Sequence, residues 1–130
     1  MKDLTLNEYQ KQAMTTCMES SNNPLYMLFM LGEEVGELHG KIAKAIRKEW
    51  IVFVGNKMVV NYDVVEESEF NKWLELVQKE LGDILWGVAG LSFIMDCPLN
   101  NIGEGNLDKL SLRKAAGTIV GEGDGIIRGK

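Results

Sequence analysis

A heptad-like repeat of apolar residues runs through the second half of the chain and is its clearest pattern. Its positions are three or four residues apart, a spacing that places side chains on one stripe of a helix. The sequence therefore predicts a long helix from about Phe70 that packs along this stripe in a bundle. The stripe consists of Phe70, Trp73, Val77, Leu81, Ile84, Val88, Leu91 and Met95.

A second long helix is expected in the first half of the chain. Asn23 can cap a helix whose first residue is Pro24, because proline fits the first helical position. Heptad-like spacing follows, and it predicts a helix from Pro24 to about Glu49. Its apolar stripe consists of Leu28, Leu31, Val35, Leu38 and Ile42.

Two shorter helices are expected toward the ends of the chain. Thr5 and Glu8 form a Thr-x-x-Glu capping box, which predicts a helix from about Leu6 to Glu19. Pro98 favours another helix that ends near Lys114, with an irregular first half because glycine weakens a helix by roughly 1 kcal/mol relative to alanine. The glycines concerned are Gly103 and Gly105.

Two segments depart from the helical pattern. The β-branched runs Ile51–Val54 and Met58–Val60 flank Gly55-Asn56, which predicts a β-hairpin inserted over about residues 51–62. We expect this hairpin to serve subunit contacts rather than catalysis. The glycine-rich tail at about 117–130 is typical of a segment that orders only against a partner or a ligand.

These elements predict an all-α fold. We expect a single domain over residues 1–130, built as a bundle of about four helices with a small inserted hairpin. The apolar stripes of the two long helices are longer than one small subunit can cover. The sequence therefore predicts a homodimer or a dimer of dimers, which is a homotetramer.

Composition and charge narrow the classes of partner. With 19 acidic and 14 basic residues, the 130-residue chain has a net charge of −5 and lacks the basic surface that nucleic-acid binding requires. The longest apolar run, Leu25–Leu31, is far too short for a membrane span. Cys17 and Cys97 match no metal spacing and are typical of buried thiols in a reducing cytosol. We expect a cytoplasmic protein with neither nucleic acid nor membrane as a partner.

Five acidic residues stand beside the apolar stripes of the two long helices: Glu33, Glu34 and Glu37 on the first, Glu80 and Asp83 on the second. If the stripes pack antiparallel, the carboxylates converge, and two unit charges about 4 Å apart repel by roughly 4 kcal/mol at an effective dielectric of about 20. Such a cluster requires a divalent cation, and all-oxygen ligands favour Mg²⁺ or Mn²⁺. Each pair taken alone is more often a solvated helix face, so spacing by itself leaves both interpretations open.

Together the two acidic segments resemble the signature of a known family. Glu33-Glu34-Val35-Gly36-Glu37 and Glu80-Leu81-Gly82-Asp83 look like the Glu-Glu-x-x-Glu and Glu-x-x-Asp motifs of MazG-like nucleoside triphosphate pyrophosphohydrolases. Segments between Asn106 and Asp124 are similar to the phage-like branch of this all-α superfamily. The resemblance implies Mg²⁺-dependent hydrolysis of (deoxy)nucleoside triphosphates to the monophosphate and pyrophosphate, with Mn²⁺ as a substitute metal and nucleotide-pool house-cleaning as the expected role.

The resemblance also implies a role for each acidic residue. Glu34, Glu37, Glu80 and Asp83 would bind Mg²⁺, and Glu33 would position or deprotonate the attacking water. The chain departs from the family four residues after the metal-binding aspartate, where a glycine, Gly87, stands in place of a frequent tyrosine.

Five further residues are candidates for contact with a nucleoside triphosphate. Asn106, Lys109 and Arg113 share one helix face, which would bring two positive charges to a polyphosphate, although a solvated basic face is an equally good interpretation. Lys44 lies on the same side of its helix as Glu37, which allows a phosphate contact. By the resemblance, Arg128 would be a further phosphate ligand.

Two other functions remain open at this stage. One is a related all-helical pyrophosphohydrolase that is specific for dUTP or acts on phosphoribosyl-ATP. The other is a helical protein that binds metal or nucleotide without turnover. A screen of nucleotides for pyrophosphate release separates the three.

Overall fold

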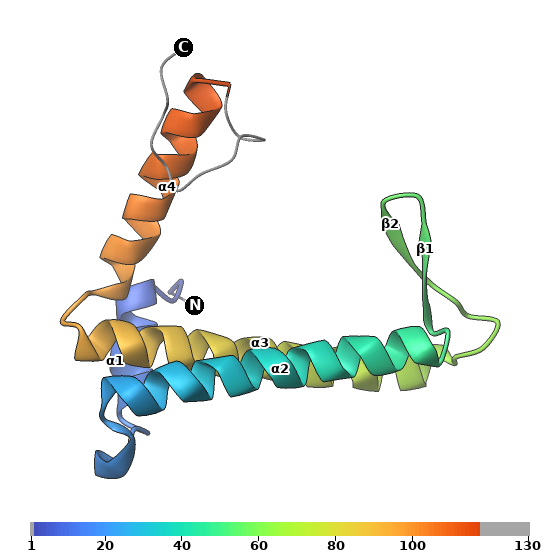
Figure 1. Cartoon of the computed structure of the whole chain (residues 1–130), viewed down its shortest axis with the longest axis horizontal. Coiled ribbons are helices and arrows are strands. Elements are labelled where there is room, and N and C mark those ends of the chain that lie inside the picture. The colour runs from blue at the N-terminus through green and yellow to red at the C-terminus, as the bar shows by residue number, and fades with distance from the viewer. Residues whose placement is uncertain (1, 118–130) are drawn as a thin grey trace.

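The computed structural model describes residues 2–117, which form four α-helices and one two-stranded hairpin (Figure 1). The all-α prediction with an inserted hairpin is confirmed. No single helix in this described range is long and apolar enough to cross a membrane. The helices Glu67–Ile94 and Leu99–Ala115, bent by 103° relative to each other, meet the length and composition of a span only when taken together. The elements are α1 (Leu6–Met14), a 3₁₀ turn (Glu19–Ser21), α2 (Pro24–Arg47), β1 (Ile51–Val54), β2 (Lys57–Val60), α3 (Glu67–Ile94) and α4 (Leu99–Ala115).

Helices α2 and α3 form the body of the molecule, side by side and antiparallel (Figure 1). Helix α2 begins as expected, because Asn23 Oδ1 accepts a hydrogen bond from the Tyr26 amide at 2.7 Å and Pro24 occupies the first turn. The hairpin joins the end of α2 to the start of α3. Its turn has Gly55 at φ +62°, a left-handed conformation that glycine adopts without strain.

An aromatic core closes the hairpin end of the α2–α3 pair. Ile51 of β1 is 1% exposed and packs in one cluster with Ala45 of α2 and Phe70 of α3. The rings of Phe70 and Trp73 lie 5.2 Å apart, and the Trp73 indole donates to the Lys41 carbonyl of α2 at 3.1 Å. These contacts fix α3 against the last turns of α2.

Helix α1 closes the opposite end through one buried side chain, Gln10. Its amide nitrogen donates to the Ala89 carbonyl at 3.1 Å and the Cys97 carbonyl at 3.2 Å, and its oxygen accepts from the Leu99 amide at 3.0 Å. One side chain thereby satisfies backbone groups of α3, of the turn after it and of α4. Because buried polar groups need such partners, Gln10 sets the sharp turn from α3 into α4.

The end of α1 and the first half of α4 differ from the predictions. Helix α1 ends at Met14, not near Glu19, and the hydroxyls of Thr15 and Thr16 bond back to carbonyls of its last turn at 2.6 and 2.7 Å. The expected irregular first half of α4 is also wrong, because the helix is continuous over Leu99–Ala115. A Cβ at Gly103 would lie 3.0 Å from Leu6, so this glycine allows the close approach of α4 to α1.

The apolar stripe of α3 is buried near its start but not in the middle of the helix, and its last residue, Met95, is 65% exposed. Phe70 and Val77 are buried as expected, whereas Leu81 is 50% exposed. The position that faces α2 instead belongs to Glu80, which is 7% exposed. A carboxylate therefore takes the place that the heptad assigned to leucine.

The close packing of α1 and α2 against α3 predicts opposite effects of two alanine substitutions. A Cβ at Gly90 would lie 2.6 Å from the sulfur of Met27, which is fully buried, whereas a Cβ at Gly82 would meet nothing within 4 Å. We expect Gly90→Ala to lower the free energy of unfolding by about 1–2 kcal/mol through overpacking. Gly82→Ala, the matched control, should raise it by up to about 1 kcal/mol through helix propensity. Urea unfolding followed by circular dichroism measures both, and equal effects would contradict the packing.

Candidate metal centre

The middle of the α2–α3 pair is acidic rather than apolar. Glu34 lies seven residues after the fully buried Met27, so it is on the side of α2 that faces α3. Glu80 lies three residues after the buried Val77 and takes the matching side of α3. The two helices therefore direct one carboxylate each into their shared interface.

Three carboxylates meet there and form what we call the acidic cluster: Glu34, Glu37 and Glu80. One oxygen of each lies within 4.8 Å of the other two. The Lys41 ammonium lies 3.0 Å from Glu80 Oε1, and it is the cation that the described residues pair with the cluster. Glu34 Oε2 and Glu80 Oε2 are buried and have no hydrogen-bond partner among residues 2–117.

The acidic cluster is electrostatically strained. Burial raises the pKa of Glu34, and the charges of Asp83, Glu37 and Glu80 raise it further. The Glu80 charge raises the pKa of Glu37, with burial as the second cause. The Lys41 ammonium, by contrast, holds the pKa of Glu80 below its ordinary value. One lysine thus neutralises one carboxylate, and the other two retain their repulsion.

The residues of the acidic cluster fit a hard divalent cation. Their donors are all carboxylate oxygens, and two buried oxygens lack a partner, which is a costly state for a buried acceptor. Oxygen donors without imidazole or thiolate favour Mg²⁺ or Mn²⁺ over zinc. The metal type expected from the sequence stays a prediction.

The other two predicted acidic residues lie beside the cluster rather than within it. Asp83 is exposed, but its charge raises the pKa of Glu34, and the two residues share the wall of a cavity of ≈320 Å³. Glu33 is also exposed and stands about 100° around α2 from Glu34. Its charge contributes to the raised pKa of Glu37. Asp83 thus borders the cluster on α3, and Glu33 on α2.

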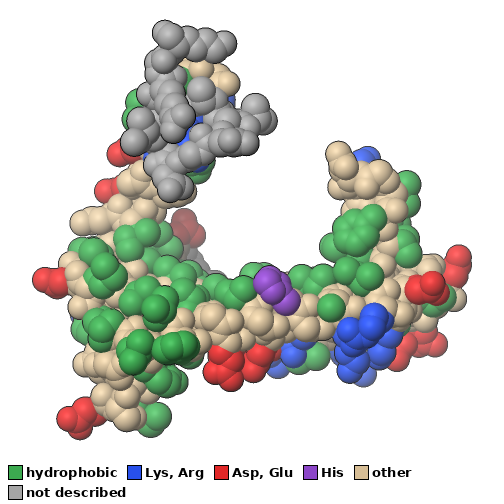
Figure 2. Space-filling view, viewed as in Figure 1, with side chains coloured by type: hydrophobic (Ala, Val, Ile, Leu, Met, Phe, Trp, Pro, Cys, Tyr) green, Lys and Arg blue, Asp and Glu red, His purple; other side chains and the backbone are tan. Residues whose placement is uncertain are grey.

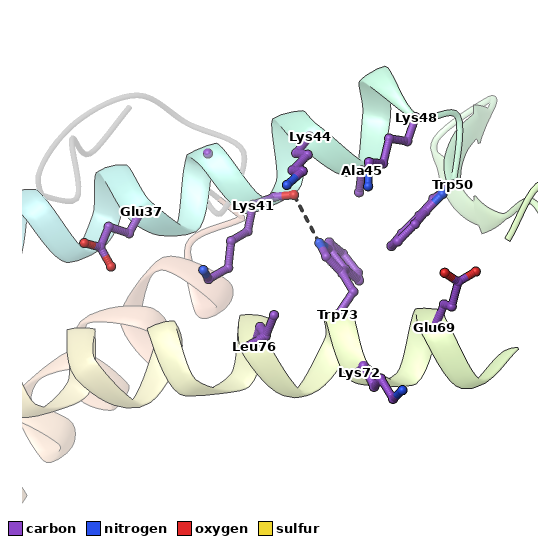
Figure 3. Close-up of a pocket in the computed structure, with 11 residues that line it drawn as sticks. Glu37, Lys41, Lys44, Ala45, Lys48, Trp50, Glu69, Lys72, Trp73 and Leu76 are labelled. Carbon is purple, nitrogen blue, oxygen red and sulfur yellow. Dashed lines mark hydrogen bonds between the residues drawn. The ribbon is translucent and has the colours of Figure 1, made fainter. Parts of the chain in front are cut away.

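Of the predicted substrate residues within 2–117, Lys44 is the one that lies near the acidic cluster. It lines a second cavity, of ≈710 Å³, whose wall also includes Glu37 and Lys41 (Figure 3). Asn106, Lys109 and Arg113 are on α4, which packs on α1 and on the end of α3 and then leaves the bundle (Figure 1). Within one chain these three are not brought to the acidic cluster. Arg128 lies outside the described residues.

Lys41 is the site residue that the sequence analysis missed. It stands four residues after Glu37 and seven after Glu34, so helical periodicity alone places it on their side of α2. The structure also explains the glycine at position 87. A Cβ there would lie 3.2 Å from side-chain atoms of both Leu31 and Met30, so these two side chains would have to shift to admit a larger residue.

Comparison with known proteins identifies one relative. The chain is 32% identical to the Gene 37 protein of Mycobacterium phage L5 over 100 residues, which span 76% of this chain and 73% of that protein. No protein-family model matches the chain. No solved structure matches it either. The name of the relative states no activity.

The strained carboxylates predict how stability depends on pH and metal. Because the pKa of Glu34 is raised, the folded protein holds this proton more tightly than the unfolded chain, and the contribution of Glu34 to stability falls as the pH rises from about 4.5 through the raised pKa. In chelator at neutral pH, Glu34→Gln should therefore raise the melting temperature. Mg²⁺ should raise the melting temperature of the parent protein more than that of the variant.

Glu75→Gln is the matched control, since Glu75 is exposed on α3 and is not part of the acidic cluster. It should change neither the pH dependence nor the response to Mg²⁺. Thermal unfolding of the three proteins at pH 5 and pH 7.5, with and without Mg²⁺, measures both effects. If Mg²⁺ raises the melting temperature of Glu34→Gln as much as that of the parent protein, Glu34 is not a metal ligand.

Proposed function

The chain belongs to the same family as the Gene 37 protein of Mycobacterium phage L5, and we propose that it is a MazG-like, Mg²⁺-dependent nucleoside triphosphate pyrophosphohydrolase. Its reaction is the hydrolysis of (deoxy)nucleoside triphosphates to the monophosphate and pyrophosphate. The observation that carries this proposal is the convergence of Glu34, Glu37 and Glu80 with two buried carboxylate oxygens left unpaired. The likeness of the two acidic motifs to the MazG-like signature supports the same chemistry.

The residues divide into metal ligands and a candidate base. Glu34, Glu37 and Glu80 would hold Mg²⁺, with Asp83 at the border of the cluster as a further ligand. When bound, Mg²⁺ neutralises phosphate oxygens and lowers the pKa of a coordinated water. Glu33 is solvent-exposed beside these ligands and is available to accept a proton from the attacking water.

The proposed reaction is a single hydrolysis. The water oxygen forms a bond to the α-phosphorus, and the bond from that phosphorus to the oxygen bridging the α- and β-phosphates breaks. Glu33 takes the proton of the water, and pyrophosphate leaves with the bridging oxygen. House-cleaning of nucleotide pools is the role we propose for this activity.

We expect pyrophosphate release to require Mg²⁺ or Mn²⁺ and to stop in excess chelator. Loss of the proposed base should lower the rate of catalysis without weakening the binding of metal or nucleotide. Glu33→Gln should lower kcat by roughly 10²–10⁴-fold, the range for a positioned general base, while Mn²⁺ and nucleotide binding stay nearly unchanged. Steady-state pyrophosphate release and calorimetry with a non-hydrolysable triphosphate measure the two properties. Glu75→Gln again serves as the control.

The outcomes distinguish the alternatives. Undiminished activity in chelator would contradict the metal requirement, and loss of Mn²⁺ binding in Glu33→Gln would make Glu33 a ligand rather than a base. A panel of nucleotides that includes dUTP and phosphoribosyl-ATP tests the specific pyrophosphohydrolases. Intact nucleotide after long incubation with Mg²⁺ would favour a protein that binds without turnover.

We further propose that the chain works as a homodimer or homotetramer. Space-filling Figure 2 shows acidic and basic side chains along one edge of the α2–α3 pair and apolar side chains along the other, in the hollow between α4 and the hairpin. Helical periodicity places large apolar residues of α2 and α3 on this second face, and they are between 38% and 57% exposed. They are Leu28, Ile46, Leu74, Leu81 and Leu85. Burial of this face against a second copy leaves the acidic cluster open on the opposite edge.

A single charge on the apolar face should weaken this assembly. Light scattering should give a mass of at least two chains for the parent protein. Leu85→Glu should raise the dissociation constant by about tenfold or more, because it buries an unpaired charge in the contact. Leu4→Glu is the control, since Leu4 is 63% exposed and precedes α1. A monomeric parent protein at working concentration would contradict the proposed assembly.

A further inference from the structure

A basic cavity lies beside the acidic cluster, between α2 and α3, on the side toward the hairpin (Figure 3). Its volume is ≈710 Å³, and we call it the lysine cavity. Four ammonium groups and two carboxylates line it, in a chain whose net charge is −5. These charged residues are Lys41, Lys44, Lys48, Lys72, Glu37 and Glu69. Such a lining attracts a small, multiply charged anion.

The lysine cavity adjoins the acidic cluster, because Glu37 belongs to both and Lys41, in the cavity wall, is paired with Glu80 of the cluster. Lys41 is held at the boundary by its 3.0 Å ion pair with Glu80. Lys44 follows on the same side of α2, seven residues after Glu37. An anion in the cavity therefore has one end at the acidic cluster and the other among the lysines.

The two tryptophans in the cavity wall are already engaged by other groups. The Trp73 indole donates to the Lys41 carbonyl at 3.1 Å and its ring packs on Phe70. The Lys48 ammonium lies 4.6 Å from the ring centre of Trp50, in a cation–π contact. These contacts occupy indole surface that a nucleobase would need for stacking, and they keep the Lys48 charge in the wall. The lining therefore suits phosphate better than a base.

The cavity on the other side of the acidic cluster has the opposite character. Its ≈320 Å³ are lined by Tyr26, Met30 and Trp86 together with Glu34 and Asp83, and among the described residues no lysine or arginine lines it. Aromatic and thioether groups suit a base or sugar, and two carboxylates repel phosphate. The acidic cluster thus separates a basic cavity from an aromatic one.

We propose that the lysine cavity binds the β- and γ-phosphates of the nucleoside triphosphate, and pyrophosphate after cleavage, so that the nucleoside points toward Tyr26 and Trp86. The inference rests on the proposed function and gives the substrate a direction across the metal centre. Lysine ammonium groups supply charged hydrogen bonds to phosphate oxygens. The α-phosphate then lies over the acidic cluster, where the water attacks.

Calorimetry with inorganic pyrophosphate in the presence of Mg²⁺ tests this direction. The double variant Lys44→Ala/Lys72→Ala removes one exposed lysine from each helix and should bind pyrophosphate about tenfold or more weakly, the effect of losing charged hydrogen bonds. Lys57→Ala, in the exposed hairpin, should bind it like the parent protein. Mn²⁺ binding should be equal in all three proteins, which excludes an indirect effect on the metal centre.

Titrations with dAMP, dGMP, dCMP, dTMP and dUMP give the second arm. The double variant should bind these monophosphates like the parent protein. If it binds a monophosphate more weakly but pyrophosphate normally, the nucleotide lies in the reverse direction and the proposal is overturned. Pyrophosphate binding that is unaltered in the double variant would by itself also overturn the proposal. If pyrophosphate binding depends on the lysines but no triphosphate is hydrolysed, the proposed function fails while the lysine cavity stands as a polyphosphate site.

Discussion

Burial of Glu80 opposite Glu34 is the constraint on which the rest of the structure depends. A carboxylate in a helix interface is unfavourable unless it is paired, and Lys41 satisfies one oxygen of Glu80 but leaves a second oxygen, and one of Glu34, without a partner. In the middle of the α2–α3 pair, these unpartnered oxygens therefore oppose the packing of the two helices. A divalent cation at this point would turn the weakest part of the interface into a cross-link between the helices.

The two ends of the pair compensate for that middle. At one end the hairpin and the Phe70–Trp73 aromatic pair lock α3 to the last turns of α2. At the other end Gln10 connects α1 with α3 and the start of α4 through three hydrogen bonds. The carboxylates are thus held on rigid helices between two closed ends, which is the kind of support that a precise metal site requires.

The same helices also separate two kinds of surface. Along α2, Glu37, Lys41 and Lys44 follow one side, while the exposed Leu28 and Ile46 follow the opposite side. Charge around the acidic cluster is ordered as well, from the aromatic cavity through the carboxylates to the lysine cavity. If the proposed function holds, this arrangement would give a linear anionic substrate one preferred direction and would leave the apolar face for contact with a second copy.

The sequence by itself determined the elements that depend on local interactions. The Thr5–Glu8 capping box, the Asn23-Pro24 start of α2 and the hairpin turn at Gly55 are all present, because each acts within a few residues. The acidic motifs were also visible in the sequence, since helical spacing relates Glu34 to Glu37 and Glu80 to Asp83.

Only the tertiary structure decided which of these residues meet. Glu80 and Leu81 are neighbours about 100° apart on α3, and contact with α2 selects the glutamate as the buried one. Likewise, the ion pair of Lys41 with Glu80 joins two residues distant in sequence through the packing of α2 on α3. The direction in which α4 leaves the bundle depends on Gln10 of α1, whose oxygen accepts from the Leu99 amide. Periodicity fixes positions around one helix, but the rotation of each helix against its neighbour follows from the packing of the whole domain.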